Sequence, residues 1–168
     1  KTTLVADYLS HRPMDTIWYQ VDSSDADPAT FFYFVSQAIQ QRGAKGDPLP
    51  LLAPENLADL EGFTRRYLRD LCNRLRAPFA IVLDNFQDGA EASALKTLLQ
   101  AALSEVPTGG CVFVVGRSGP PAALARYRAN DRLVVVDWDE LQLTREEQDG
   151  IIALRGLQFD EGALETLY

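Results

Sequence analysis

The chain has 168 residues, 46% of them hydrophobic and 24% charged, which is the composition of an ordinary globular domain. Its formal net charge of −8 argues against direct binding of nucleic acid, and no apolar run reaches the length of a membrane helix. A single histidine excludes His-rich metal sites, and Cys72 and Cys111 lack a metal-ligand or redox spacing. We therefore expect a cytoplasmic protein with two reduced core thiols, and no membrane or nucleic-acid contact by this segment.

Helical and strand patterns alternate along the first half of the chain. Apolar residues recur at helical spacing over residues 1–9, and a β-branched and aromatic run predicts a strand over 16–21. A helix should start after Asp27, because Pro28 is favoured at a first helical position, and another should cover 59–75. The side chains expected to face the core from these two helices are Phe31, Phe34, Val35, Ala38, Ile39, Leu60, Phe63, Tyr67, Leu68 and Leu71.

The second half continues the alternation. Apolar runs predict strands over 79–83, 111–115 and 132–136, and a helix over 92–103 separates the first two. Residues 144–147 have the form of a capping box and should open a further helix. The pattern predicts an α/β fold with a parallel sheet of at least four strands and right-handed crossovers. The chain starts without methionine and stops inside a helical pattern, so we expect a piece of a larger protein, truncated at both ends.

One strand organises the candidate site. Residues 79–83 are apolar, and the run stops abruptly at Asp84, with Asn85, Gln87 and Asp88 close behind. A continuous apolar run is typical of a strand that is buried on both faces of a parallel sheet. The Asp84 carboxylate would then lie at the carboxyl edge, where open α/β sheets bind their ligands. The alternative is that Asp84 merely opens a loop after a core strand.

Lys1, Thr2 and Thr3 stand at the start of the first predicted helix. A phosphate loop ends in Lys followed by Ser or Thr: the Lys reaches the β- and γ-phosphates, and the hydroxyl ligates Mg²⁺. Mg²⁺ is usually held by one or two protein oxygens together with nucleotide phosphates, so Thr2 and Asp84 would suit it. The alternative is an ordinary helix start.

Arg117 follows the predicted strand over 111–115 and should also project at the carboxyl edge. A guanidinium there could recognise a terminal phosphate, and a surface arginine that opens a loop is the alternative. Asp22 ends the strand over 16–21, where a solvated turn with a helix cap is the preferred interpretation.

In their order along the chain, these motifs resemble the signal-transduction ATPases with numerous domains, the STAND class of P-loop NTPases. The resemblance is to the branch that contains the maltose-regulon activator and the large ATP-binding LuxR-type transcriptional regulators. The stretches that carry it are Lys1-Thr2-Thr3-Leu4, residues 17–32, 79–86 as a second nucleotide motif, 115–121 with 124–128 as an Arg-bearing sensor stretch, and 139–147.

The resemblance implies a three-layer P-loop NTPase core, AAA+-like, over residues 1–155, lacking its first strand and glycine loop. Residues 156–168 would start a following helical segment. The implied function is a switch that binds ATP or ADP with Mg²⁺ and controls other domains of the same polypeptide, with nucleotide-dependent self-association. The implied roles are nucleotide binding by Lys1, Thr2, Thr3 and Arg117, and metal binding by Thr2 and Asp84.

Two departures from that pattern leave alternatives open. The loop glycines are absent before Lys1, so an interaction module that no longer binds nucleotide is the first alternative. Asn85 stands where the branch often has a second acid; it can position water but cannot accept a proton, so we expect slow hydrolysis or none, a weak ATPase at most. A P-loop kinase or other P-loop enzyme is the second alternative, although Arg126 and Arg128 offer little sign of an arginine-rich lid.

Overall fold

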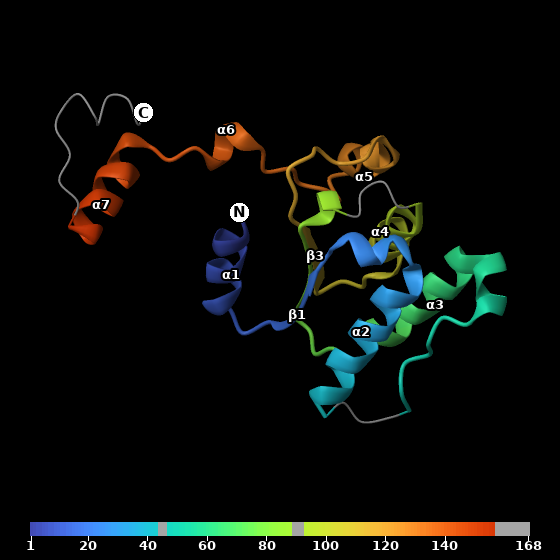
Figure 1. Ribbon diagram of the computed structural model, residues 1–168. Coiled ribbons are helices and arrows are strands. Elements are labelled where there is room, and N and C mark those ends of the chain that lie inside the picture. Colours follow the sequence, from blue (N-terminus) through green and yellow to red (C-terminus); the bar gives the residue numbers. More distant parts are fainter. Residues whose placement is uncertain (44–46, 89–92, 157–168) are drawn as a thin grey trace.

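The computed structural model describes residues 1–43, 47–88 and 93–156, and it has helices on both sides of a parallel sheet (Figure 1). The strands are β1 (Asp15–Gln20), β2 (Phe79–Asp84) and β3 (Gly110–Val114). The α-helices are α1 (Thr2–Ser10), α2 (Pro28–Gln41), α3 (Leu60–Cys72), α4 (Ser93–Glu105), α5 (Ala125–Ala129), α6 (Trp138–Leu141) and α7 (Arg145–Arg155). The predicted alternation of helices and strands is confirmed for the described residues as far as β3.

The three described strands lie in the order β1-β2-β3, and both pairs are parallel. The central strand β2 is hydrogen-bonded on both edges and covered on both faces, so all six of its residues are buried. In the register, Gln20 lies opposite Asp84, and Leu83 lies opposite Val114. The carboxyl ends of the three strands therefore meet at one edge of the sheet.

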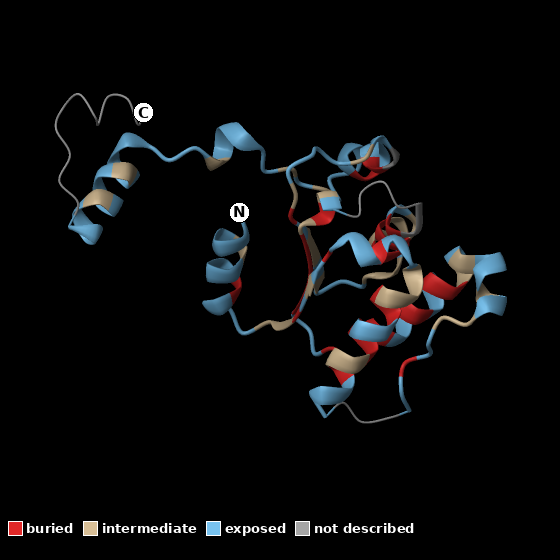
Figure 2. Cartoon of the chain, in the orientation of Figure 1, coloured by how far each residue is buried: buried red, intermediate tan, exposed pale blue. Residues whose placement is uncertain are grey.

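The main core lies between one face of the sheet and helices α2, α3 and α4, where the buried residues gather (Figure 2). Aromatic rings join α2 to α3: Phe32 lies edge-to-face against Phe63 and Tyr67, with ring centroids 4.9 and 4.8 Å apart. Such pairs contribute roughly 0.5–1.5 kcal/mol beyond the apolar area they bury. These contacts fix the helices that connect β1 to β2.

Helix α1 covers the opposite face of the sheet with a smaller apolar cluster. Leu9 of α1 is buried in the same cluster as Ala80 and Val82 of β2, and the Tyr8 ring lies 6.0 Å from the ring of Phe113. Because α1 runs along this face, its first residues reach the carboxyl edge of the sheet. Lys1 and Thr2 are thereby brought to the end of β2.

Three sequence predictions are wrong. Residues 132–136 form no strand and Val134 is 82% exposed, because these residues pair with none of the described strands; the described sheet has three strands, fewer than expected. In α2 the buried stripe contains Phe32, whereas Phe34 is 55% exposed, since the helical period turns it away from the other buried positions. Cys111 is exposed, because β3 lies at the end of the strand order.

The last described helix, α7, begins as the sequence predicts. The Glu147 N–H donates to Thr144 Oγ1 (3.2 Å), and the Thr144 N–H donates to Glu147 Oε2 (2.8 Å), which completes the capping box. The helix extends away from the sheet (Figure 1). Of the predicted segment 156–168, all but Gly156 lies outside the described residues. No described helix has the length and apolar character needed to span a bilayer.

Replacing Tyr67 by Phe should lower the free energy of unfolding by about 1–3 kcal/mol, as urea titration would measure. The buried Tyr67 hydroxyl donates to the Phe32 carbonyl (3.1 Å) and lies 3.0 Å from the Ser36 hydroxyl, so both groups would lose a partner. Tyr33→Phe is the matched control, because Tyr33 is exposed and, among the described residues, its hydroxyl accepts only from Gln37 (3.1 Å). Equal losses in the two variants would contradict this account of the core.

Candidate functional site

Asp84 is the last residue of β2 and is only 4% exposed. Its Oδ1 atom accepts two hydrogen bonds, one from the Thr2 hydroxyl at 3.1 Å and one from the Asn85 N–H at 2.9 Å. Its backbone carbonyl accepts from the Val21 N–H at 2.8 Å, which continues the pairing with β1. The carboxylate is therefore held at the sheet edge, and its second oxygen, Oδ2, makes no hydrogen bond with the described residues.

The start of α1 brings Lys1 and Thr2 to the same edge. The Lys1 ammonium donates to the Gly116 carbonyl at 3.0 Å, across 115 positions of sequence, while Thr2 bonds Asp84 across 82 positions. Both residues are exposed, so their polar groups face solvent as well as the edge. Thr3 is also exposed, and it makes no hydrogen bond to Asp84 or Gly116.

The segment after β3 also borders the site, next to the end of β2 and the start of α1. The Val115 N–H donates to Leu83, and the Phe86 N–H donates to Val115, so this backbone follows the end of β2 closely. The Arg117 N–H donates to the side-chain oxygen of Gln87 at 3.2 Å. The Arg117 guanidinium is exposed and makes no hydrogen bond or ion pair with the described residues.

Asn85 has a left-handed backbone, with φ of +55°, a conformation that asparagine tolerates better than most residues. This turn directs the Asn85 N–H back to the Asp84 carboxylate. The chain then continues into a 3₁₀ turn over Phe86–Asp88, which carries Gln87 toward Arg117. Asn85 is half-buried at the edge where a water-positioning side chain would have to lie.

The end of β1 has a structural role instead. Asp22 caps the 3₁₀ turn over Ser23–Ala26 by accepting from the Ser24 N–H (2.7 Å) and hydroxyl (2.5 Å). These two bonds lower the pKa of the Asp22 carboxyl, the side-chain bond most strongly. Asp27 likewise caps α2 through the Ala29 N–H at 2.9 Å. The preferred interpretation of Asp22 as part of a capped turn is confirmed.

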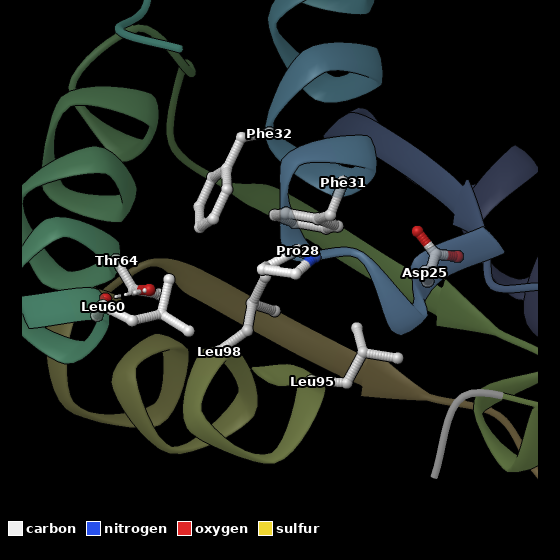
Figure 3. A pocket seen from close by; sticks show the side chains of 8 residues that line it. All are labelled: Asp25, Pro28, Phe31, Phe32, Leu60, Thr64, Leu95 and Leu98. Atoms are coloured by element: carbon white, nitrogen blue, oxygen red, sulfur yellow. Dashed lines mark hydrogen bonds between the residues drawn. The ribbon is translucent and has the colours of Figure 1, made fainter. Parts of the chain in front are cut away.

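Asp25 carries a buried carboxylate, and the sequence pattern did not predict its burial. It is 2% exposed and accepts from the Tyr19 hydroxyl at 2.5 Å and from the Asp22 N–H at 2.9 Å. It borders a cavity of about 10 Å³ between α2, α3 and α4, which has room for one water at most (Figure 3). The lining residues are Asp25, Pro28, Phe31, Phe32, Leu60, Thr64, Leu95 and Leu98. This space belongs to core packing and not to a ligand site.

The polar side chains of Lys1, Thr2 and Asp84 at the sheet edge suit a hard cation together with an anion. A hydroxyl and a carboxylate from Thr2 and Asp84 are oxygen ligands of the kind Mg²⁺ takes, and the Lys1 ammonium beside them attracts phosphate. Within the described residues, no three His, Cys, Asp or Glu side chains form a group that could hold a metal. A cation at Asp84 would therefore depend on oxygens from a bound phosphate.

Of the residues singled out from the sequence, the structure brings Lys1, Thr2, Asp84 and the backbone of Arg117 to one edge. Their functional roles remain predictions. Sequence reasoning missed the bond between Gln87 and Arg117, although Gln87 was visible in the polar cluster after the strand. It also missed the Gly116 carbonyl as the partner of Lys1, because a backbone acceptor leaves no mark in the sequence.

Among known proteins, the chain is similar to proteins described as "HTH-type transcriptional regulator MalT". The one from Vibrio cholerae serotype O1 is 27% identical over an alignment of 170 positions, which covers 92% of this chain and 18% of that protein. Those from Vibrio campbellii and Vibrio parahaemolyticus are 27% and 26% identical over 154 residues, 88% of this chain and 16% of each relative. The chain thus spans less than a fifth of the length of these curated relatives. No family model and no solved structure matches it.

Tyr19 should stay protonated in the folded protein at a pH where it ionises in the unfolded chain. Burial, and then the bond to Asp25, raise the pKa of Tyr19 above its ordinary value of 10.0. A raised folded-state pKa stabilises the fold fully below the unfolded pKa, and that stability is lost as pH rises through the folded value. The ¹³C signal of the Tyr19 ring, followed to about pH 11 with and without urea, measures this. Titration at the same pH in both states would contradict it.

Proposed function

We propose that this chain is the ATP/ADP-binding switch domain of a multidomain transcriptional regulator, a STAND-type P-loop core that hydrolyses ATP slowly or not at all. The observation that carries the proposal is the convergence of Lys1, Thr2 and Asp84 at one sheet edge, although Thr2 and Asp84 are 82 positions apart in the sequence. An ammonium, a hydroxyl and a carboxylate in this arrangement match what Mg²⁺ and nucleotide phosphates need.

The Thr2–Asp84 contact is the sharpest support. A hydroxyl hydrogen-bonded to a buried carboxylate at 3.1 Å is already at the separation of two ligands on one cation. When Mg²⁺ binds, both oxygens would turn their lone pairs to the ion, and the nucleotide phosphates and waters would complete its shell. Lys1 would exchange the Gly116 carbonyl for a phosphate oxygen, because a charged pair is the stronger hydrogen bond.

The connectivity of the sheet supports a phosphate loop just ahead of Lys1. Helices α2 to α4 lie on one face of the sheet and carry the chain from β1 to β2 to β3, whereas α1 lies on the opposite face. Since parallel crossovers are right-handed, a strand leading into α1 would have to lie beyond β3. Its carboxyl end would then open directly onto Lys1, and its far edge would offer residues 132–136 a partner.

Asn85 favours a nucleotide-binding switch over an enzyme that hydrolyses ATP rapidly. Its left-handed backbone fixes the residue beside Asp84, and its amide can hold a water by hydrogen bonds. An amide cannot take a proton from that water, so general-base catalysis has no group at this position. A domain that keeps its nucleotide for long periods is suited to signalling its ATP or ADP state to other domains, and to nucleotide-dependent self-association.

The similarity to MalT supports the regulatory part of the proposal. Those relatives are described as HTH-type transcriptional regulators, and each is more than five times as long as the segment matched here. The net charge of −8 makes this segment itself an unsuitable DNA-binding surface. DNA binding and the sensing of the signal would therefore belong to other domains of the polypeptide.

In the full-length polypeptide, Lys1→Ala and Asp84→Ala should each weaken binding of MgATP roughly ten- to a hundredfold, as calorimetric titration would measure. The Asp84 change should also make binding less dependent on Mg²⁺, since it removes a metal ligand. Asp70→Ala is the matched control, because Asp70 is an exposed carboxylate on α3 and should leave binding unchanged.

Two results would overturn the proposal. If the full-length polypeptide binds neither ATP nor ADP, the chain is an interaction module that has lost nucleotide binding. If nucleotides bind and both substitutions leave the affinity unchanged, they bind elsewhere. Circular dichroism of each variant separates a lost ligand contact from a lost fold.

A further inference from the structure

The Gly116–Arg117 peptide is held from both of its sides. Its carbonyl accepts from the Lys1 ammonium at 3.0 Å, and its N–H donates to Gln87 Oε1 at 3.2 Å. The two partners differ in kind: Lys1 is an exposed cation at the N-cap of α1, while Gln87 is a half-buried amide in the turn after β2. One peptide unit thus links the start of α1 to the turn that follows Asp84.

Gln87 is itself oriented by its surroundings. Its Nε2 donates to Asp88 Oδ1 at 3.2 Å, so the amide oxygen is the atom that faces Arg117. The approach to the backbone is close, because a Cβ added at Gly116 would lie 3.4 Å from that oxygen. The Phe86 N–H bond to Val115 keeps the whole turn against the end of β3 at 3.0 Å.

This arrangement matters when an anion reaches Lys1. The Lys1 ammonium would leave the Gly116 carbonyl for the anion, since charge-assisted hydrogen bonds are the stronger ones. The bond from Gln87 would then be the side-chain contact that still holds this peptide. The Arg117 guanidinium has no partner among the described residues, so its direction depends on how firmly its backbone is fixed.

We propose that Gln87 is a positioning residue that fixes the Arg117 backbone, so that its guanidinium meets the terminal phosphate of ATP once Lys1 has moved to the nucleotide. The inference rests on the proposed nucleotide switch and adds to it a residue that discriminates ATP from ADP. Gln87 acts through Arg117 and touches no phosphate. Replacing Gln87 should therefore weaken the binding of ATP, whose γ-phosphate would meet Arg117. It should leave the binding of ADP, which lacks this phosphate, unchanged.

The test compares ATP and ADP binding by calorimetry in the full-length polypeptide with Mg²⁺. Gln87→Met keeps the length of the side chain and removes the acceptor. It should lower the affinity for ATP about fivefold, the size of one hydrogen bond, and leave the affinity for ADP unchanged. In an Arg117→Ala background the same change should have no effect on the ratio of the two affinities. Gln40→Met, an identical change on the exposed end of α2, is the matched control.

The outcomes separate this inference from the proposed function. If the unchanged protein binds neither nucleotide, the switch proposal fails and the role of Gln87 fails with it. If both nucleotides bind and Gln87→Met keeps the original ATP-to-ADP ratio, only the role of Gln87 is overturned. The role of Gln87 is also overturned if Gln87→Met lowers the affinity for ATP equally with and without the Arg117 side chain, because Gln87 would then not act through Arg117.

Discussion

The burial of β2 on both faces and both edges is the constraint on which the rest of the structure depends. A strand in this position cannot shift, because β1 and β3 fix its register and its side chains fill the two cores. Asp84, its last residue, is therefore buried at the sheet edge, where its carboxylate has little room to move. A carboxylate held in this way can serve as a fixed ligand, which a carboxylate on a mobile loop does far less well.

The candidate site assembles because the two faces of the sheet are covered by different parts of the chain. Helices α2 to α4 occupy one face, so α1 packs on the other and brings Lys1 and Thr2 to the end of β2. The backbone after β3 completes the site: the Gly116 carbonyl accepts from Lys1, and the Arg117 N–H donates to Gln87 in the turn after β2.

The sequence predicted the parts of this structure that depend on local pattern. The run ending at Asp84 indicated a buried central strand, and Thr144 with Glu147 indicated a helix start. Predictions failed where neighbours decide the outcome: residues 132–136 pair with none of the described strands, and in the aromatic run of α2 the predicted core residue Phe34 is exposed while Phe32 is buried. The bond from Gln87 to Arg117 depends on how the turn after β2 meets the end of β3, which spacing alone does not encode.

The central claim is that Mg²⁺ and a nucleotide bind at the carboxyl edge, between Thr2 and Asp84. The most direct measurement adds ATP with Mn²⁺, a paramagnetic substitute for Mg²⁺, to isotope-labelled protein and follows its amide signals by NMR. The account predicts that the signals of Thr2 and Asn85 broaden, while those of Asp15 and Gly110, at the starts of strands on the opposite edge, stay sharp. Uniform broadening, or none at saturating nucleotide, would contradict it.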